Sequence, residues 1–179
     1  MERFLYPALL VPPCSLTFSD QYAFRPTGST TAAIIQLFHI ITELLTYHPY
    51  VVVISLDFSK AFDTVRHASL LQKLAMRDIP DCVYNWLVVY FSGHYHCIAF
   101  HGQISSLLNI SASIIQGSGV GPVSYVVNAG DLTPVTPGNS FCKFAEDTYL
   151  VIPASSINSR SDELDNFIEN TAYSLSNVV

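Results

Sequence analysis

Two apolar segments of this sequence lead directly into carboxylates, and this pattern constrains the fold more than any other feature. Residues 51–56 read Val-Val-Val-Ile-Ser-Leu and are followed by Asp57. Residues 144–151 read Phe-Ala-Glu-Asp-Thr-Tyr-Leu-Val, so Glu146 and Asp147 have apolar residues on both sides. Runs of apolar, β-branched and aromatic residues predict buried strands. We therefore expect one strand that ends at Asp57 and a hairpin that carries Glu146 and Asp147 at its tip.

A lone acid at the end of a strand and an acid pair at the tip of a hairpin can converge on one point. Carboxylates that lie close together repel one another, and a divalent cation offsets this repulsion while preferring hard oxygen ligands. The arrangement suits a two-metal site for phosphoryl transfer. The alternative for any one of these acids is a solvated side chain at the end of a strand.

The composition predicts one folded domain without a membrane partner. The chain has 179 residues, of which 50% are hydrophobic and 12% charged, against about 25% charged in a typical domain. Residues 82–130 include no Lys, Arg, Asp or Glu, but polar residues interrupt them well before the roughly 20 apolar residues of a membrane helix. The net charge is −6, from 8 basic and 14 acidic residues. This balance argues against an intact nucleic-acid enzyme, which usually carries a basic stripe.

The four cysteines, at positions 14, 82, 97 and 142, form neither a C-x-x-C pair nor a zinc-binding spacing. We expect reduced, buried thiols without a disulfide partner. An apolar stretch after Arg3 is interrupted by prolines, so it does not predict a signal peptide. The chain is therefore expected to be intracellular, in the nucleus or the cytoplasm.

Apolar periodicity and capping residues predict the other elements. The expected elements are helices over about 30–48, 68–77, 80–91 and 161–172, a loop over 117–122 with a helix after it to about 131, a strand over 50–57, and hairpins over 94–110 and 140–152. The residues expected to face inward are Ile34, Leu37, Phe38, Ile41, Leu45, Leu70, Leu71, Leu74, Trp86, Val89, Leu164, Phe167 and Ile168. The acids of the last helix are expected on its opposite side. Strands and helices do not alternate regularly, which favours the α+β class.

Two local motifs each allow more than one interpretation. Residues 116–122 read Gln-Gly-Ser-Gly-Val-Gly-Pro, but the third glycine of G-x-G-x-x-G falls on Pro122, so a dinucleotide loop is disfavoured. A flexible loop that approaches a nucleotide or nucleic acid fits better, with a plain turn as the alternative. His94 and His96 share one face of a predicted strand, yet no third metal ligand lies nearby in sequence, so exposed or core imidazoles are expected.

Four segments, taken in order, resemble the reverse transcriptase domain of non-LTR (LINE-type) retrotransposons. They are Asp-Gln-Tyr-Ala-Phe-Arg-Pro-Thr-Gly-Ser-Thr at 20–30, Leu-Asp-Phe-Ser-Lys-Ala-Phe-Asp-Thr-Val at 56–65, Gln-Gly-Ser with Gly-Pro within 116–122, and Phe-Ala-Glu-Asp-Thr at 144–148. The resemblance extends over about residues 20–170. It implies an α+β right-hand polymerase palm with an antiparallel sheet, packed helices and partial fingers. Residues 1–179 would form one partial domain, with a fingers remnant over 1–49, the palm over 50–179 and no thumb.

The resemblance also implies a reaction and a metal site. The family activity is RNA-templated DNA synthesis, with an RNA template, a DNA primer and a dNTP as partners. Asp57, Glu146 and Asp147 would be the catalytic residues and would bind two Mg²⁺ ions.

Four further residues match nucleotide- or template-binding positions of the family. Phe62, which by itself predicts only a core aromatic, matches the residue that excludes the ribose 2′-OH of the incoming nucleotide. Gln116 and Gly117 match a loop that touches template and nucleotide. Arg25 matches a fingers arginine beside the template.

The sequence departs from the family at several of these positions. Glu146 stands where the family has aspartate, and its extra methylene conflicts with the near-ideal octahedral geometry of Mg²⁺. A misplacement of about 1 Å can cost on the order of 10²-fold in rate. His94 replaces a family arginine, and Ile115 a family proline. The first fingers strands, a palm lysine and the thumb are expected to be missing.

We therefore expect a truncated and inactive copy. The alternative is a non-catalytic remnant of a retrotransposon that serves as a scaffold or interaction module. A palm-type nucleotide cyclase is disfavoured because its Gly-Gly-Asp/Glu-Glu-Phe turn is absent.

Overall fold

The computed structural model describes residues 18–175 apart from 26, 59 and 116, with side chains described up to residue 169. Its centre is a three-stranded antiparallel sheet in the order β1-β7-β6. Strand β1 is Val51–Leu56, β6 is Ser140–Phe144 and β7 is Asp147–Pro153. The predicted strand and the predicted acid-bearing hairpin are both confirmed. Strands β6 and β7 are buried on both faces, whereas β1 lies at the edge of the sheet and leaves Val53 exposed.

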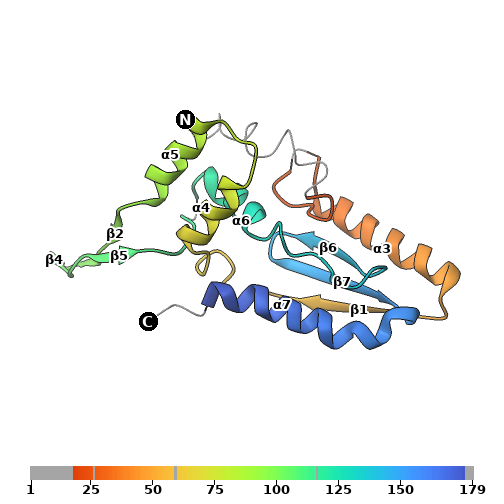
Figure 1. Ribbon diagram of the computed structural model, residues 1–179. Helices are drawn as coiled ribbons and strands as arrows, with labels where there is room; N and C mark the ends of the chain where they lie inside the picture. Colours follow the sequence, from red (N-terminus) through yellow and green to blue (C-terminus); the bar gives the residue numbers. More distant parts are fainter. Residues whose placement is uncertain (1–17, 26, 59, 116, 176–179) are drawn as a thin grey trace.

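Two long helices lie on opposite sides of this sheet (Figure 1). Helix α3 is Thr30–Tyr47, and the Ser29 hydroxyl caps it by accepting from the Ala32 amide. The helix ends before Pro49, since a residue that precedes proline disfavours the α conformation. Helix α7 is Arg160–Leu175 and follows the 3₁₀ helix η2, Ala154–Ser159. On the α7 side of the sheet, Phe167 packs with apolar side chains of the strands and with Leu132, which lies in the loop before β6.

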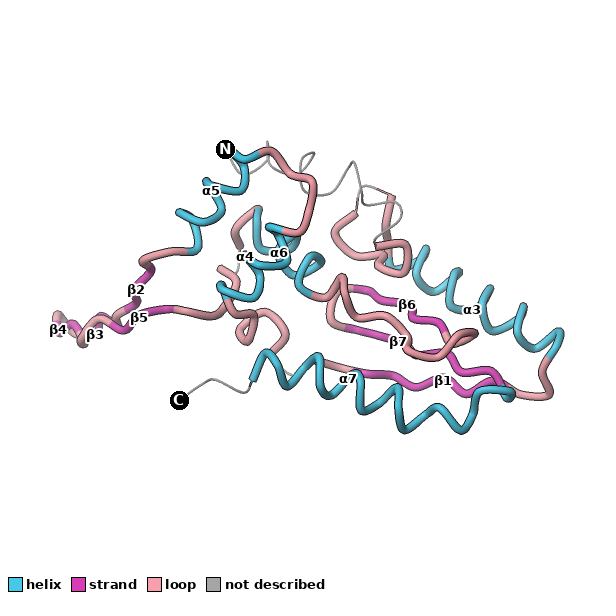
Figure 2. Tube along the Cα trace, viewed as in Figure 1, coloured by secondary structure: helices cyan, strands magenta, loops and turns pink. Residues whose placement is uncertain are grey.

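Three shorter helices form a second group beside the sheet (Figure 2). They are α4 (His67–Ala75), α5 (Asp81–Phe91) and α6 (Val120–Asn128). Their shared core includes Leu70, Leu74, Leu87, Val123 and Val127. Helix α6 begins inside the predicted loop, because Pro122 lies in its first turn, where no backbone N–H is needed.

A narrow β-ribbon extends away from the three helices (Figures 1 and 2). In it β2 (His94–His96) pairs with β5 (Leu108–Ile110), and β3 (Ala99–Phe100) pairs with β4 (Gln103–Ile104). The turn residues His101 and Gly102 have φ of 46° and 77°, as two-residue hairpin turns require. The predicted hairpin over 94–110 is confirmed, although its ladder is interrupted in the middle. Together these pairings confirm the α+β class with antiparallel sheets.

The inward face predicted for α3 is partly wrong. Ile34, Phe38 and Leu45 are exposed, and Ala33 is the buried residue of the helix. The Cys142 thiol of β6 donates to the Ala33 carbonyl at 3.4 Å. Because the small Ala33 side chain lets the helix approach the sheet at this point, the inward stripe is rotated. It consists of Ala33, Leu37, Ile40, Ile41 and Leu44.

Two other predicted faces also need correction. Val89 of α5 is 74% exposed, and Leu87 and Phe91 of the same helix are buried instead. Ile168 of α7 is 59% exposed, whereas the acid Glu163 is fully buried one turn before Phe167.

The burial of Glu163 has a local cause. Its carboxylate accepts hydrogen bonds from the backbone amides of Val135 and Thr136 at 3.1 and 2.8 Å. It also accepts one from the Asn139 side-chain amide at 2.9 Å. A buried carboxylate is tolerated where several N–H donors satisfy it, so Glu163 attaches α7 to the loop that precedes β6.

Cys82, Cys97 and Cys142 carry free thiols, the first two exposed and the last buried, whereas Cys14 lies outside the described residues. The expectation of buried thiols is therefore wrong for Cys82 and Cys97, which lie on surface elements. No helix in the described part of the chain is both long and apolar enough to cross a lipid bilayer.

The thiol of Cys142 is expected to resist alkylation in the folded protein. Burial, followed by the negative charge of Asp20, raises its pKa from 9 to about 11, and the thiolate is the nucleophile. In a Cys14→Ser variant at pH 8, iodoacetamide should modify Cys82 and Cys97 and should reach Cys142 only after urea unfolding. Peptide mass spectrometry measures this, and native protein alkylated at all three sites would contradict the prediction.

Candidate active site

The pairing of β1 with β7 brings the predicted acids to one end of the sheet. The last pair of the ladder is Leu56 with Thr148, so Asp57 and Asp147 are the next residues on the two strands. Opposed residues in an antiparallel pair have Cα atoms about 4.5–5.5 Å apart. Glu146 lies in the two-residue turn between β6 and β7. The backbone positions of all three predicted acids are therefore neighbours.

A small pocket of ≈ 220 Å³ opens at this end of the sheet. Asp57 and Glu146 line it, together with residues of the segment that follows β1: Phe58, Lys60, Ala61, Phe62 and Asp63. Phe62 is half-buried; it borders the pocket and also packs against the core of the three shorter helices. Its ring packs against Tyr125 at 4.7 Å and meets the edge of Phe24 at 6.4 Å between centroids. A role of Phe62 toward a nucleotide stays a prediction.

Tyr125 of α6 is a site residue that the sequence patterns do not single out, because its neighbours in the helix are also buried. Burial raises the pKa of its hydroxyl far above 10, and the charges of Glu146, Asp57 and Asp147 add to the effect in that order. Within the described residues the hydroxyl has no hydrogen-bond partner. The charges of all three carboxylates thus raise the pKa of one buried phenol.

The three carboxylates suit a divalent cation in their chemistry, since hard cations prefer oxygen ligands. Asp57 and Asp147 are exposed and Glu146 is half-buried. Across the residues with described side chains, however, no three Asp, Glu, His or Cys side chains are close enough together to hold a metal ion. Binding would require the three side chains to move closer to one another.

The other predicted binding residues lie apart from this pocket or outside the described residues. The Arg25 guanidinium donates to the carbonyls of Phe18 and Gln21 at 2.5 and 3.0 Å, so these donors already have partners within the chain. Gly117 is exposed and has a φ of +85°, a left-handed conformation that favours glycine. Gln116 is not among the described residues. Contacts of all three with template or nucleotide stay predictions.

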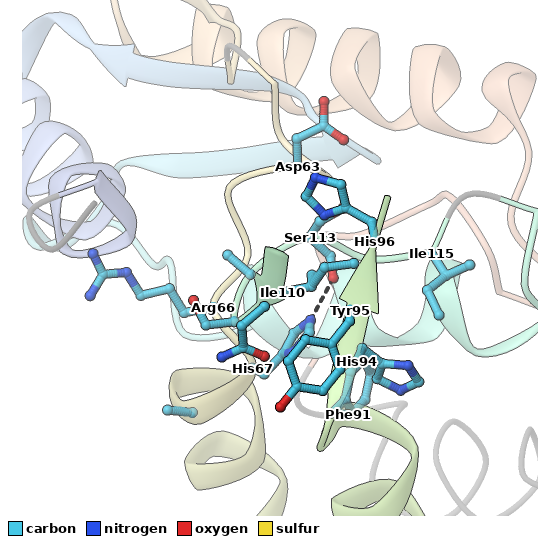
Figure 3. Close-up of a pocket in the computed structure, with 14 residues that line it drawn as sticks. Asp63, Arg66, His67, Phe91, His94, Tyr95, His96, Ile110, Ser113 and Ile115 are labelled. Carbon is cyan, nitrogen blue, oxygen red and sulfur yellow. Dashed lines mark hydrogen bonds between the residues drawn. The ribbon is translucent and has the colours of Figure 1, made fainter. Parts of the chain in front are cut away.

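A larger pocket of ≈ 860 Å³ lies between α4, the end of α5 and the β-ribbon (Figure 3). His94 and His96 line it as residues of one strand face, and His67 joins them from α4. An Nε2 atom of His67 contacts the Ser113 carbonyl at 2.7 Å, and the Nε2 of His94 contacts the Tyr90 carbonyl. These two ring nitrogens are engaged with the backbone, and His96 is exposed.

Comparisons with known proteins identify relatives of this chain. Residues 2–177 match the sequence model of the family described as "Reverse transcriptase (RNA-dependent DNA polymerase)". The chain is 29% identical over 156 residues to the RNA-directed DNA polymerase from mobile element jockey of Drosophila melanogaster, which covers 83% of this chain and 17% of that protein. It is 28% identical over 134 residues to the Retrovirus-related Pol polyprotein from type-1 retrotransposable element R2 of Popillia japonica, covering 68% of this chain and 22% of that protein. The chain thus spans about a fifth of the length of these relatives.

Solved structures of apo telomerase from Candida tropicalis share the fold. One matches with a TM-score of 0.68 at 10% identity, covering 96% of this chain and 34% of that chain. Another, truncated from the C-terminal domain, has a TM-score of 0.65 at 12% identity and covers 91% of this chain and 36% of that chain. The fold and the family match agree with the resemblance to non-LTR retrotransposon polymerases, and the chain belongs to the reverse transcriptase (RNA-dependent DNA polymerase) family.

Proposed function

We propose that this chain is the palm of an RNA-directed DNA polymerase, with residues 1–49 as part of the fingers, and that the acid end of the sheet is its metal site. The observation that carries the proposal is the register of β1 with β7. Leu56 pairs with Thr148, so Asp57 and Asp147 lie opposite each other at the next position of the two strands. The shared influence of the three carboxylates on Tyr125 supports it.

In this proposal Asp57, Glu146 and Asp147 hold two Mg²⁺ ions. When bound there, the ions would supply the charge that activates the primer 3′-OH and that stabilises in-line attack. Phe62 borders the pocket beside Asp57 and would exclude a ribose 2′-OH. Gln116, Gly117 and Arg25 would contact the template and the incoming nucleotide. The chain's own contribution is positioning and electrostatics.

We also propose that the 179-residue polypeptide alone does not copy RNA. Glu146 is one methylene longer than the aspartate of the family, which disfavours octahedral Mg²⁺ coordination. The net charge of −6 opposes the binding of a polyanion.

The second candidate function is an interaction module, and the β-ribbon favours it. Six of its large apolar side chains are 57–72% exposed, and exposed apolar surface of this kind marks interaction sites. These side chains are Tyr95, Ile98, Phe100, Ile104, Leu107 and Leu108.

Binding of Mn²⁺ tests the proposed metal site without requiring activity. Mn²⁺ accepts the same carboxylate ligands as Mg²⁺. Electron paramagnetic resonance measures the concentration of unbound Mn²⁺. We expect Asp57→Asn to weaken Mn²⁺ binding at least about tenfold, the factor that corresponds to 1.4 kcal/mol. The matched control is Asp162→Asn, an exposed acid in the first turn of α7 with the same change in charge. Equal affinities in the two variants would overturn the proposed site.

A further inference from the structure

The turn that carries Glu146 is held by a side chain from a distant part of the sequence. Gln21 is 3% exposed. Its Oε1 atom accepts from the Ala145 amide at 2.9 Å, and its Nε2 atom donates to the Ala145 carbonyl at 3.4 Å. One amide group thus bonds both backbone polar groups of the residue directly before Glu146, 124 residues away along the chain.

Two features of this turn oppose its formation. Ala145 has a φ of +54°, a left-handed conformation in which the Cβ of an L-residue is crowded. The next two residues, Glu146 and Asp147, carry adjacent negative charges, and Asp57 follows β1 beside them. Like charges at this distance repel. The turn therefore needs an external constraint, and the Gln21 amide is placed to supply it.

Gln21 is itself fixed by the strand that leads into the turn. The Lys143 amide donates to the Asp20 carbonyl at 2.7 Å, and the Tyr22 amide donates to the Lys143 carbonyl at 2.9 Å. The buried Lys143 ammonium also pairs with the Asp20 carboxylate at 2.7 Å. The segment around Gln21 is thereby attached to the edge of β6. This attachment holds the Gln21 side chain within hydrogen-bonding distance of Ala145.

We propose that Gln21 is a positioning residue for the metal site. By bonding both polar groups of Ala145 it keeps this residue in the left-handed conformation, and the conformation of Ala145 sets the direction of the Glu146 carboxylate toward Asp57. The part that concerns metal rests on the proposed function, whereas the constraint on the turn does not.

The substitution Gln21→Met tests the constraint, because methionine keeps the length of the side chain and removes its hydrogen bonds. Hydrogen exchange of the Ala145 amide, followed by NMR, should become about tenfold faster, because this amide loses its acceptor. Exchange at Leu150 and Ile152, in the middle of β7, should change less, because the effect is local. The control is Asn139→Leu, which removes the hydrogen bonds of another buried amide to Ser159 and Glu163. Asn139 precedes β6 at the end opposite the turn, so its loss should leave exchange at Ala145 unchanged relative to Leu150.

The affinity for Mn²⁺ separates a positioning role from a purely structural one. We expect Gln21→Met to weaken Mn²⁺ binding several-fold and Asn139→Leu to leave it unchanged. Faster exchange at Ala145 with unaltered affinity would overturn the positioning role, and unaltered exchange at Ala145 would overturn the constraint itself. If the unmodified chain binds no Mn²⁺, the proposed function fails, and the exchange measurement still decides whether Gln21 holds the turn.

Discussion

Asp20→Ala is expected to lower the free energy of unfolding by about 3 kcal/mol or more, because it leaves a buried ammonium without its counter-ion. Lys143 is 2% exposed and lies 2.7 Å from the Asp20 carboxylate. Its Nζ also donates to the carbonyls of Leu132 and Ala129 at 2.5 and 3.4 Å. These carbonyls accept hydrogen bonds from the ammonium but do not neutralise its charge. The loss of Asp20 therefore destabilises the folded state.

Urea unfolding followed by circular dichroism measures this change in the free energy of unfolding. Two further variants serve as comparisons. Asp131→Ala removes the more exposed pair of Asp131 with Lys73, which is 2.8 Å long, and should cost less than about 1 kcal/mol. Adding Lys143→Met to Asp20→Ala should recover most of the stability, because a buried pair can often be replaced by apolar side chains. An equal loss in the free energy of unfolding for Asp20→Ala and Asp131→Ala would show that the buried Lys143 pair stabilises the fold no more than the exposed one.

The central elements of the fold could be predicted because their signals are local. The apolar run before Asp57 and the acid pair flanked by apolar residues define β1, β6 and β7. Ser29 and Pro49 mark the two ends of α3. Since the strand ends also fix where the acids lie, the end of the sheet that carries them followed directly from the pattern.

The inward faces of helices could not be predicted equally well, because they depend on what each helix packs against. A small residue, Ala33, is buried against the sheet, whereas the larger Ile34, Phe38 and Leu45 remain exposed. The sequence predicts that Glu163 is a surface acid, yet its carboxylate is buried because it accepts hydrogen bonds from three N–H donors of residues 135–139. Such partners belong to a loop that no helical periodicity describes.

The residues that support the candidate site were missed for a related reason. Gln21, Lys143 and Tyr125 act through contacts with residues far away in sequence. In the sequence, Gln21 is only part of a segment that resembles the family, and Lys143 is a single charge within an apolar strand. Burial of these polar side chains becomes meaningful only once the fold supplies their partners.

The 179-residue polypeptide is expected to show no primer extension on an RNA template with Mg²⁺. Binding of a primer–template depends mainly on cations that contact phosphates, and this chain has 8 basic residues against 14 acidic ones. Several of the basic residues are engaged within the fold: Lys143 pairs with Asp20, Lys73 pairs with Asp131, and Arg25 donates to backbone carbonyls. Few cations therefore remain to hold the substrate.

Glu146→Asp alone should not restore extension, because it shortens one proposed metal ligand without adding affinity for the primer–template. The decisive experiment compares the unmodified chain, Glu146→Asp and Asp57→Ala in one primer-extension assay, with an active reverse transcriptase as the assay control. Products from Glu146→Asp alone would show that the misplaced ligand is the main defect and that substrate binding is sufficient. Products from the unmodified chain that disappear in Asp57→Ala would show that the polypeptide is a working polymerase, since loss of a ligand for both metals abolishes two-metal catalysis.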